Sequence, residues 1–462
     1  MKFIFFITIL FFSLSIFSQS EKTKQYLSDF DILTTSLKEL SPIYYRKLGK
    51  NNIDLEIEKT QTLINTSKSP EEVILHIQKF LFLIGDGHIF NTNIYNPELN
   101  KKALPFDVYI FENQLFIKKF PDKPELNGIE ILELNSIKSS KIIDSLSVFF
   151  TNDGGRNHTP YHFQILFNSL FSTFISTNDS LTIKTKNQLY HFNMLHSSDS
   201  LFKQIVLNQN ENYLGSNRFV NSEIQEKYGY FYCIGFQKKL KDHMLMKEYE
   251  RFIKNIIKSK TPNLIIDLRY NAGGDPALAA KMCQYLVKNR FNAYENAFIT
   301  KTKRPTFIKF MGNKKMYFFR NFGVKEIDTL RKRYFFDHDL NKTFKPKKHC
   351  FEGNIYLITG TMTHSSATMF CHYLSNQENV KFIGSTTTGA INYLCAGTHC
   401  ELSLPYLKTT YSFGLDLLEL KNESFKNEIE TPLLPDVEIK YTIKEILENK
   451  DLEMKFILNL IQ

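Results

Sequence analysis

The sequence has few cysteines and contains no internal repeat or low-complexity tract. Its six cysteines are scattered over 462 residues, which excludes the dense disulfide framework of a small secreted scaffold. Cys395 and Cys400 are close enough to pair across a loop, whereas Cys283 and Cys371 fall in apolar helical patterns typical of core thiols. With 42% hydrophobic residues, a chain of this length should fold into two or three globular domains.

Long apolar runs are missing after residue 20. Residues 1–20, MKFIFFITILFFSLSIFSQS, combine one lysine, an apolar run of signal-peptide length and small polar residues. This run is short and wrongly flanked for a membrane span, so it predicts a secretory signal removed near residues 18–20. No cysteine stands near its end to carry a lipid. We therefore expect a secreted or periplasmic protein.

Positive charge exceeds negative charge, with a formal net charge of +10. The excess is dispersed, although residues 301–348 are locally rich in lysine, arginine and aromatic residues. No nucleic-acid-binding motif accompanies them, so we expect no nucleic-acid partner. A solvated, partly irregular insertion over about residues 292–350 is the better interpretation, and such an insertion could act as a lid or contact substrate.

The periodicity of apolar residues divides the chain into three regions after the signal. Residues 21–100 have helical spacing, and Ser69, Pro70 and Glu72 together mark the start of one helix. Residues 101–204 are strand-like, with a probable hairpin over 107–111 and 114–118. From residue 205 to 462 strands and helices alternate, which predicts a parallel sheet flanked by helices. The expected strands are 228–235, 264–268, 354–359 and 380–384, and the expected helices are 241–259, 277–288 and 365–374.

A pair of serines lies where an expected strand leads into a helix. Residues 361–370, TMTHSSATMF, follow the apolar strand and place Ser365 and Ser366 at this turn. The first N–H groups of a helix are unpaired and carry the positive end of its dipole. A serine there could attack a carbonyl while backbone donors hold the oxyanion, or it could simply cap the helix.

Two other segments could contribute to the same site. Residues 263–274, NLIIDLRYNAGG, form a buried-type strand that ends in Gly273 and Gly274. The diglycine either faces a ligand with its N–H groups or makes an ordinary tight turn. Residues 83–91, LIGDGHIFN, place His88 directly after a helix, where a single histidine is usually structural.

Together, and in this order, these segments resemble the serine peptidases of the tail-specific (C-terminal-processing) and tricorn type. The resemblance spans most of residues 70–460. Its matching segments are Ile84-Gly85-Asp86-Gly87-His88, Asp267-Leu268-Arg269-Tyr270-Asn271-Ala272-Gly273-Gly274, Thr363-His364-Ser365-Ser366-Ala367-Thr368, Ile383-Gly384-Ser385-Thr386-Thr387-Thr388-Gly389 and Leu434-Pro435-Asp436. It implies an α/β core of the crotonase and Clp-protease type, with a PDZ-like segment suggested by residues 128–135. It also implies peptide or unfolded-protein substrates and no metal or organic cofactor.

The resemblance implies a role for each matched residue. Ser365 would be the nucleophile, with Ser366 as the alternative, and His88 would be the general base and then the general acid. A late glutamate, Glu430 or Glu428, would orient the histidine. Backbone N–H groups of Gly273, Gly274 and Ser366 would form the oxyanion hole.

Several positions depart from the family pattern. Ala390 stands where the tail-specific branch has its lysine base, so the chain fits the tricorn-like branch. Gly87 replaces a frequent serine, Ser366 replaces alanine, and Thr368 stands where many relatives have glutamate. These departures keep open a catalytically silent protein that binds peptides or hydrophobic ligands, or one in which the serines only cap a helix.

Other histidines and cysteines offer weaker alternatives. His364 adjoins Ser365, but successive helical side chains point to different faces, so it is poorly placed as the base. His372 falls among apolar helical positions typical of buried structure. His399 lies between Cys395 and Cys400, yet no second ligand pair stands at the usual spacing, so we predict no metal site.

Overall fold

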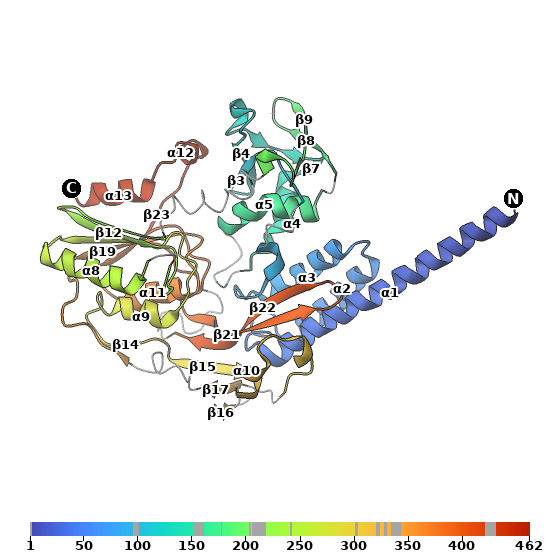
Figure 1. The fold of residues 1–462 in the computed structure, drawn as a ribbon. Helices are drawn as coiled ribbons and strands as arrows, with labels where there is room; N and C mark the ends of the chain where they lie inside the picture. Colours follow the sequence, from blue (N-terminus) through green and yellow to red (C-terminus); the bar gives the residue numbers. More distant parts are fainter. Residues whose placement is uncertain are drawn as a thin grey trace.

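The computed structural model describes residues 2–95, 101–151, 153, 161–176, 178–202, 205, 219–240, 243–300, 304–319, 324–327, 330–333, 343–420 and 431–462. Figure 1 shows a long N-terminal helix with two shorter helices beside it, a small mixed region, and a larger layered region near the C-terminus. The chain is therefore of the expected mixed α/β class.

A six-stranded sheet forms the centre of the C-terminal region. All neighbouring strands are parallel except the first pair, as the alternation of strands and helices predicts. In spatial order the strands are β11 (Val220–Ile224), β12 (Tyr228–Cys233), β13 (Asn263–Asp267), β19 (Asn354–Thr359), β20 (Val380–Gly384) and β23 (Val437–Glu438).

Helices cover both faces of this sheet (Figure 1). Because strand side chains alternate between faces, Leu264 and Ile266 pack toward α8 (Leu245–Lys258), α9 (Pro276–Cys283) and α11 (Ser366–Leu374). Ile265 points the other way and shares a cluster with Ile457 of α13 (Leu452–Leu460), which follows α12 (Ile443–Leu447). Buried on both faces, the sheet is a rigid support for the loops at its ends.

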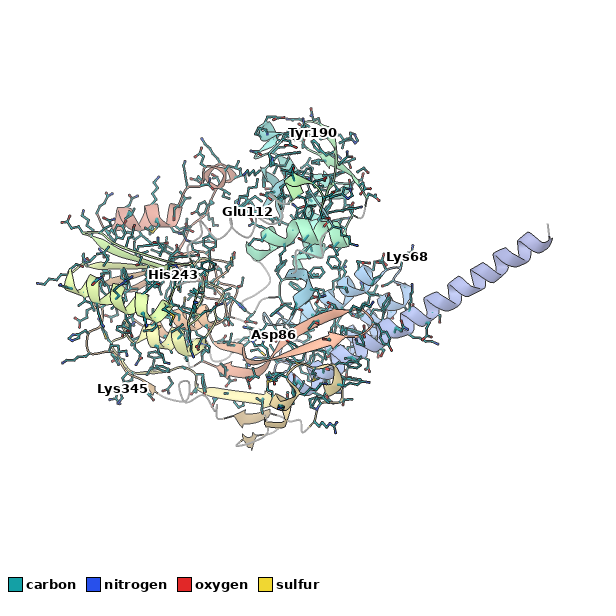
Figure 2. All side chains as sticks on the ribbon, viewed as in Figure 1. Lys68, Asp86, Glu112, Tyr190, His243 and Lys345 are labelled. Atoms are coloured by element: carbon teal, nitrogen blue, oxygen red, sulfur yellow. The ribbon has the colours of Figure 1, made fainter. Side chains whose placement is uncertain are left out.

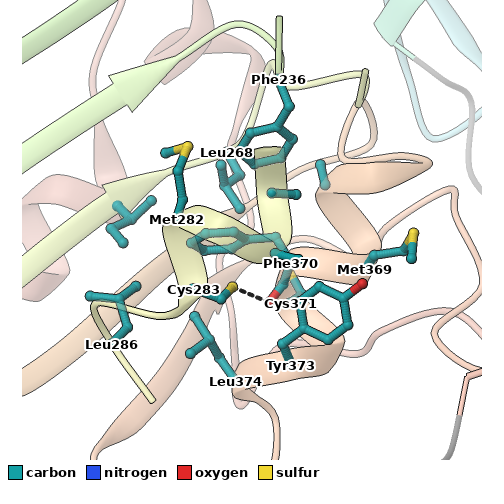
Figure 3. Close-up of a cluster of buried hydrophobic side chains, with 14 of the residues drawn as sticks. Phe236, Leu268, Met282, Cys283, Leu286, Met369, Phe370, Cys371, Tyr373 and Leu374 are labelled. Atoms are coloured by element: carbon teal, nitrogen blue, oxygen red, sulfur yellow. Dashed lines mark hydrogen bonds between the residues drawn. The ribbon is translucent and has the colours of Figure 1, made fainter. Parts of the chain in front are cut away.

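Helices α9 and α11 pack closely through apolar side chains (Figure 3). Phe236 stacks on Phe370 with ring centroids 5.6 Å apart, and the Cys283 thiol donates to the Phe370 carbonyl at 3.7 Å. Helix α9 ends at Cys283, so the expected extension to residue 288 is wrong. Residues 285–287 are buried in a turn that follows, and burial in this turn explains their apolar character without a helix.

The N-terminal region is helical, as predicted. It comprises α1 (Lys2–Leu40), α2 (Lys50–Thr66) and α3 (Pro70–Ile84). Ser69 caps α3 by accepting the N–H of Glu72 at 3.2 Å. Figure 1 shows α1 extending away from the body toward its N-terminal end. Within the described ranges, no helix combines the length and the apolar character that crossing a membrane requires.

Residues 101–202 form a mixed region with its own hydrophobic cluster. The predicted hairpin is present as β3 (Asp107–Phe111) and β4 (Gln114–Lys119). The region also contains two helices that the strand-like pattern did not predict, α4 (Ser139–Ser147) and α5 (Tyr161–Phe174). The other elements are β2 (Lys102–Ala103), η3 (Pro124–Leu126), β5 (Glu130–Ile131), β6 (Glu133–Leu134), β7 (Ile137–Lys138), β8 (Ser180–Lys184), β9 (Leu189–Asn193), β10 (Leu195–His196) and α6 (Ser200–Phe202).

A second six-stranded sheet joins distant parts of the chain. Its long hairpin consists of β21 (Tyr393–Leu404) and β22 (Thr409–Glu419), and the free edge of β22 pairs first with β1 (Phe90–Asn91) and, further along the strand, with β15 (Asn296–Thr300). The basic insertion is therefore more ordered than expected where it supplies β15. Further elements here are η1 (Thr92–Tyr95), β14 (Phe291–Asn292), η5 (Ile308–Phe310), α10 (Lys314–Phe319), β16 (Val324–Ile327), β17 (Leu330–Arg333) and β18 (Thr343–Phe344).

Candidate active site

The loops that follow β13 and β19 lie together because these parallel strands are neighbours. Thr363 joins them: its hydroxyl donates to the Leu268 carbonyl at 2.8 Å and accepts the Gly360 N–H at 2.9 Å. The His364 N–H adds a bond to the Asn271 carbonyl at 3.3 Å. The predicted serine turn and the predicted diglycine turn are thus one hydrogen-bonded unit.

Ser365 occupies the turn itself, immediately before α11, with φ 55° and ψ −127°. An ordinary N-cap has extended backbone and a side chain that accepts a helix N–H. The Ser365 backbone is not extended, and its side chain makes no capping bond. Such a backbone conformation costs about 1–3 kcal/mol and persists where the surroundings enforce it. The interpretation of Ser365 as a simple helix cap is therefore wrong.

The diglycine turn packs directly against this serine. A Cβ on Gly273, whose φ is 102°, would lie 2.7 Å from the Ser365 Cβ. The Gly273 N–H donates to the Asn271 side chain at 2.9 Å, so it is already used. The Ser366 hydroxyl donates to the Gly274 carbonyl at 2.7 Å. Of the three expected oxyanion donors, the N–H groups of Gly274 and Ser366 have no acceptor within the described part of the chain.

His88 reaches the serine from the other side of the site. It lies in a turn after α3, where Gly85 adopts a left-handed conformation, and just before β1 pairs with β22. Its Nε2 is 3.2 Å from the Ser365 Oγ, and the side chain is only 7% exposed. The structure thus brings together the two residues predicted as base and nucleophile, although 277 positions separate them.

Of the competing histidines, His364 and His399 lie beside His88, but neither forms a hydrogen bond with Ser365 within the described residues. His364 turns away from its neighbour's hydroxyl, and its Nε2 lies 3.1 Å from Asp153 Oδ2. His372 is buried and lines a separate cavity with Arg290 and Phe291. The ring of His399 is 5.8 Å from that of His88, and burial together with the charge of His88 lowers its pKa to about 4.

Two buried carboxylates surround the other nitrogen of His88. Nδ1 is 3.7 Å from both Asp86 Oδ1 and Asp153 Oδ2, distances that give charge contact without a hydrogen bond. The Asp86 oxygen accepts the His88 backbone N–H at 2.9 Å, and Asp153 accepts the Gly87 N–H at 2.5 Å. Figure 2 places Asp86 near the centre of the molecule.

The charges in this group shift one another's protonation. Burial alone would lower the pKa of His88, but Asp86 and Asp153 outweigh it, and the pKa is raised. Burial raises the pKa of Asp86. Burial also opposes ionisation of Asp153, yet its hydrogen bond with His364 and the charge of His88 bring its pKa below the usual value. A protonated His88 is thus stabilised by an ionised Asp153.

Sequence reasoning gave no role to these two aspartates. Asp86 lies within the quoted Asp-Gly-His segment, and Asp153 lies within residues 101–204, where the sequence predicted only a strand-like region. The predicted acid, Glu430, and its alternative Glu428 lie outside the described residues, so that prediction stays open. One ring nitrogen each from His88 and His364 and one carboxylate oxygen of Asp153 all lie within 4.8 Å of one another.

The structure also shows the surroundings of the positions that depart from the family pattern. Ala390 is 3% exposed, and its strand-like segment pairs with Pro432, so this position belongs to the core. A Cβ on Gly87 would come within 2.5 Å of the His364 Nε2, so a side chain there would displace this ring. Thr368 is buried and bonds to the Thr363 carbonyl at 3.5 Å.

Comparisons with known proteins bear on the family and the fold. The model of peptidase family S41 matches residues 227–393, which hold the diglycine and serine turns. Mature CPAF complexed with lactacystin has a similar structure, with 12% identity and a TM-score of 0.63 over 95% of this chain and 98% of that chain. Another structure of mature CPAF gives 12% identity and 0.60 over 92% and 94%. Such low identity establishes the fold alone. No curated protein matches the sequence.

Proposed function

We propose that this chain, whose residues 227–393 match the model of peptidase family S41, is a serine peptidase that hydrolyses peptide bonds through an acyl-enzyme on Ser365. The observation that carries the proposal is the 3.2 Å contact between the His88 Nε2 and the Ser365 Oγ. It is supported by the strained backbone of Ser365 and by the absence of a capping bond from its side chain. Strain of this kind gathers at functional sites.

In the proposed reaction, neutral His88 accepts the Ser365 proton as Oγ attacks the substrate carbonyl. The N–H groups of Gly274 and Ser366 would hold the oxyanion, and the imidazolium would then pass its proton to the departing amine. Water activated by His88 would hydrolyse the acyl-enzyme. Ser365 regains its proton in this last step, and the cycle closes.

We propose that more than one carboxylate stabilises the charged form of His88. Asp86 and Asp153 lie 3.7 Å from the His88 Nδ1 and would stabilise the imidazolium by charge. They act on the reaction through His88, so they are positioning residues. Glu430, or Glu428, remains the predicted acid that would orient His88.

Substrate and location follow from the same features. The family points to peptides or unfolded chains as substrates. The apolar residues 1–20 support export to the periplasm or the medium, with cleavage near residues 18–20. N-terminal sequencing of protein from the native host would test this, because an intact Met1 would contradict export with signal removal.

The proposed function is tested by incubating the purified protein with fluorogenic unfolded casein and with a fluorophosphonate probe. We expect hydrolysis and covalent labelling, both blocked by prior treatment with the probe. Unlabelled protein that binds peptides without cleaving them would instead support the catalytically silent alternative.

A further inference from the structure

The imidazoles of His88 and His364 and the carboxylate of Asp153 lie close together, so this cluster shares His88 with the serine–histidine pair. The Asp153 Oδ2 lies 3.1 Å from the His364 Nε2 and 3.7 Å from the His88 Nδ1. In a tetrahedral zinc site with bonds of about 2.0–2.1 Å, neighbouring ligand atoms are about 3.3 Å apart. The two distances therefore bracket the edge of a zinc tetrahedron, and both ligand types are ones that zinc prefers.

Buried atoms without a partner point to the same place. Within the described residues, neither the His88 Nδ1 nor the Asp86 Oδ2 has a hydrogen-bond partner. Their side chains are 8% and 0% exposed. A buried polar group left unpaired destabilises the folded protein, and a bound cation would remove that cost. Asp86 Oδ1 is 3.7 Å from the same Nδ1, so the charge of this carboxylate also faces the cluster, although Asp86 lies outside the group of three whose ligand atoms are all within 4.8 Å of one another.

The chain makes room for this cluster by having glycine at position 87. A Cβ there would lie 2.5 Å from the His364 Nε2 and 3.0 Å from the Asp153 Oδ1. The serine that the family often carries at this position would push His364 away from Asp153. His364 reaches the cluster because this side chain is absent.

We propose that His88, His364 and Asp153 bind a zinc ion, and that the ion reversibly silences the peptidase. The consequence for activity rests on the proposed function. A neutral imidazole that binds metal through Nδ1 carries its hydrogen on Nε2. That nitrogen then donates to the Ser365 Oγ and cannot accept its proton, so the nucleophile is not activated. Two aspartates balance the charge of the ion.

Binding is tested first without turnover, in the Ser365→Ala protein. Titration with Zn²⁺ should give one tight site by calorimetry, and Co²⁺ should give the visible absorption of a tetrahedral complex. Adding His364→Gln should weaken binding by at least about 100-fold. The matched control is His243→Gln, which removes a more exposed histidine 2.9 Å from Glu248. This control should leave zinc binding unchanged. An equal loss of zinc affinity in both variants, or no loss in either, would overturn the proposed zinc site.

The switch is tested in protein with Ser365 intact. Micromolar Zn²⁺ should stop hydrolysis, a chelator should restore it, and Mg²⁺ should have no effect. Each variant is compared with its own zinc-free rate, and His364→Gln should lose the inhibition. Tight binding together with unchanged hydrolysis would overturn the switch. If no protein hydrolyses peptides, the proposed function fails, while calorimetry still decides the metal site. Should His364→Gln not fold, Gly87→Ala, whose methyl would displace the same ring, replaces it.

Discussion

The two halves of the candidate site are held by different forces. The serine half lies at the ends of adjacent strands β13 and β19, where the Thr363 hydroxyl donates to the Leu268 carbonyl and the His364 N–H donates to the Asn271 carbonyl, so that neutral hydrogen bonds join the two loops. The histidine half lies on a turn of the N-terminal region, held by β1 pairing with β22 and by charge contacts with Asp86 and Asp153. Mutations in the serine half should therefore change the geometry of the loops and the stability of the fold. Mutations in the histidine half should change the protonation of His88.

The largest effect should come from the nucleophile. Ser365→Ala removes the attacking Oγ, and we expect hydrolysis to fall on the order of 10³-fold or more while the protein still folds. Ser366→Ala is the matched control: it loses only the hydroxyl bond to the Gly274 carbonyl, worth about 0.5–1.5 kcal/mol. Steady-state rates on a fluorogenic peptide measure both. The reverse ranking of the two variants would move the nucleophile to Ser366.

A stability effect should follow from the bond that joins the loops. Thr363→Val leaves the Gly360 N–H without its acceptor and removes one of the two hydrogen bonds to the Leu268 carbonyl, which still accepts the Asn271 N–H at 3.0 Å. A buried group left unpaired costs about 1–3 kcal/mol. Urea unfolding should therefore show clear destabilisation. Thr368→Val, which removes one long bond of 3.5 Å, should have a smaller effect. Equal unfolding midpoints for the two variants would contradict a serine half held by Thr363.

The sequence predicted the serine half better than the histidine half, for a physical reason. The ends of β19 and β20 match the expected 354–359 and 380–384, because buried strands are continuous apolar runs that end at glycine or a polar residue. Helix α5 was missed because its many aromatic residues also suit strands. Yet Phe163, Phe167 and Phe171 recur at helical spacing and are buried.

The partners of His88 were missed because tertiary structure alone brings them together. Asp153 is 66 residues from Gly87 and 211 from His364, and its loop has no periodic pattern. His364 was considered only as a base, since its neighbour is the serine. Its contact with Asp153 depends on the missing side chain at position 87. Charge clusters assembled from separate loops leave little trace in one sequence.

A smaller and different effect should come from the histidine half. Asp153→Asn removes one of the charges that raise the pKa of His88. The base must be neutral to act, so the acid limb of kcat/KM should move to lower pH. The profile is measured with a chelator present, so that no metal occupies the cluster. Glu248→Gln, near His243 and away from the serine, is the control. If the acid limb of the kcat/KM profile does not shift in Asp153→Asn, the charge of Asp153 does not raise the pKa of His88, and the account of this contact is contradicted.

The most direct test of the account is the pH dependence of fluorophosphonate labelling at Ser365, located by mass spectrometry of the digested protein. In the wild type, the labelling rate should rise with pH through one ionisation. Its apparent pKa should lie above the ordinary imidazole value of about 6.5, because Asp86 and Asp153 raise the pKa of His88. In His88→Ala, labelling should be slow and should lose this step. Wild-type labelling in a folded His88→Ala protein would contradict activation of Ser365 by His88.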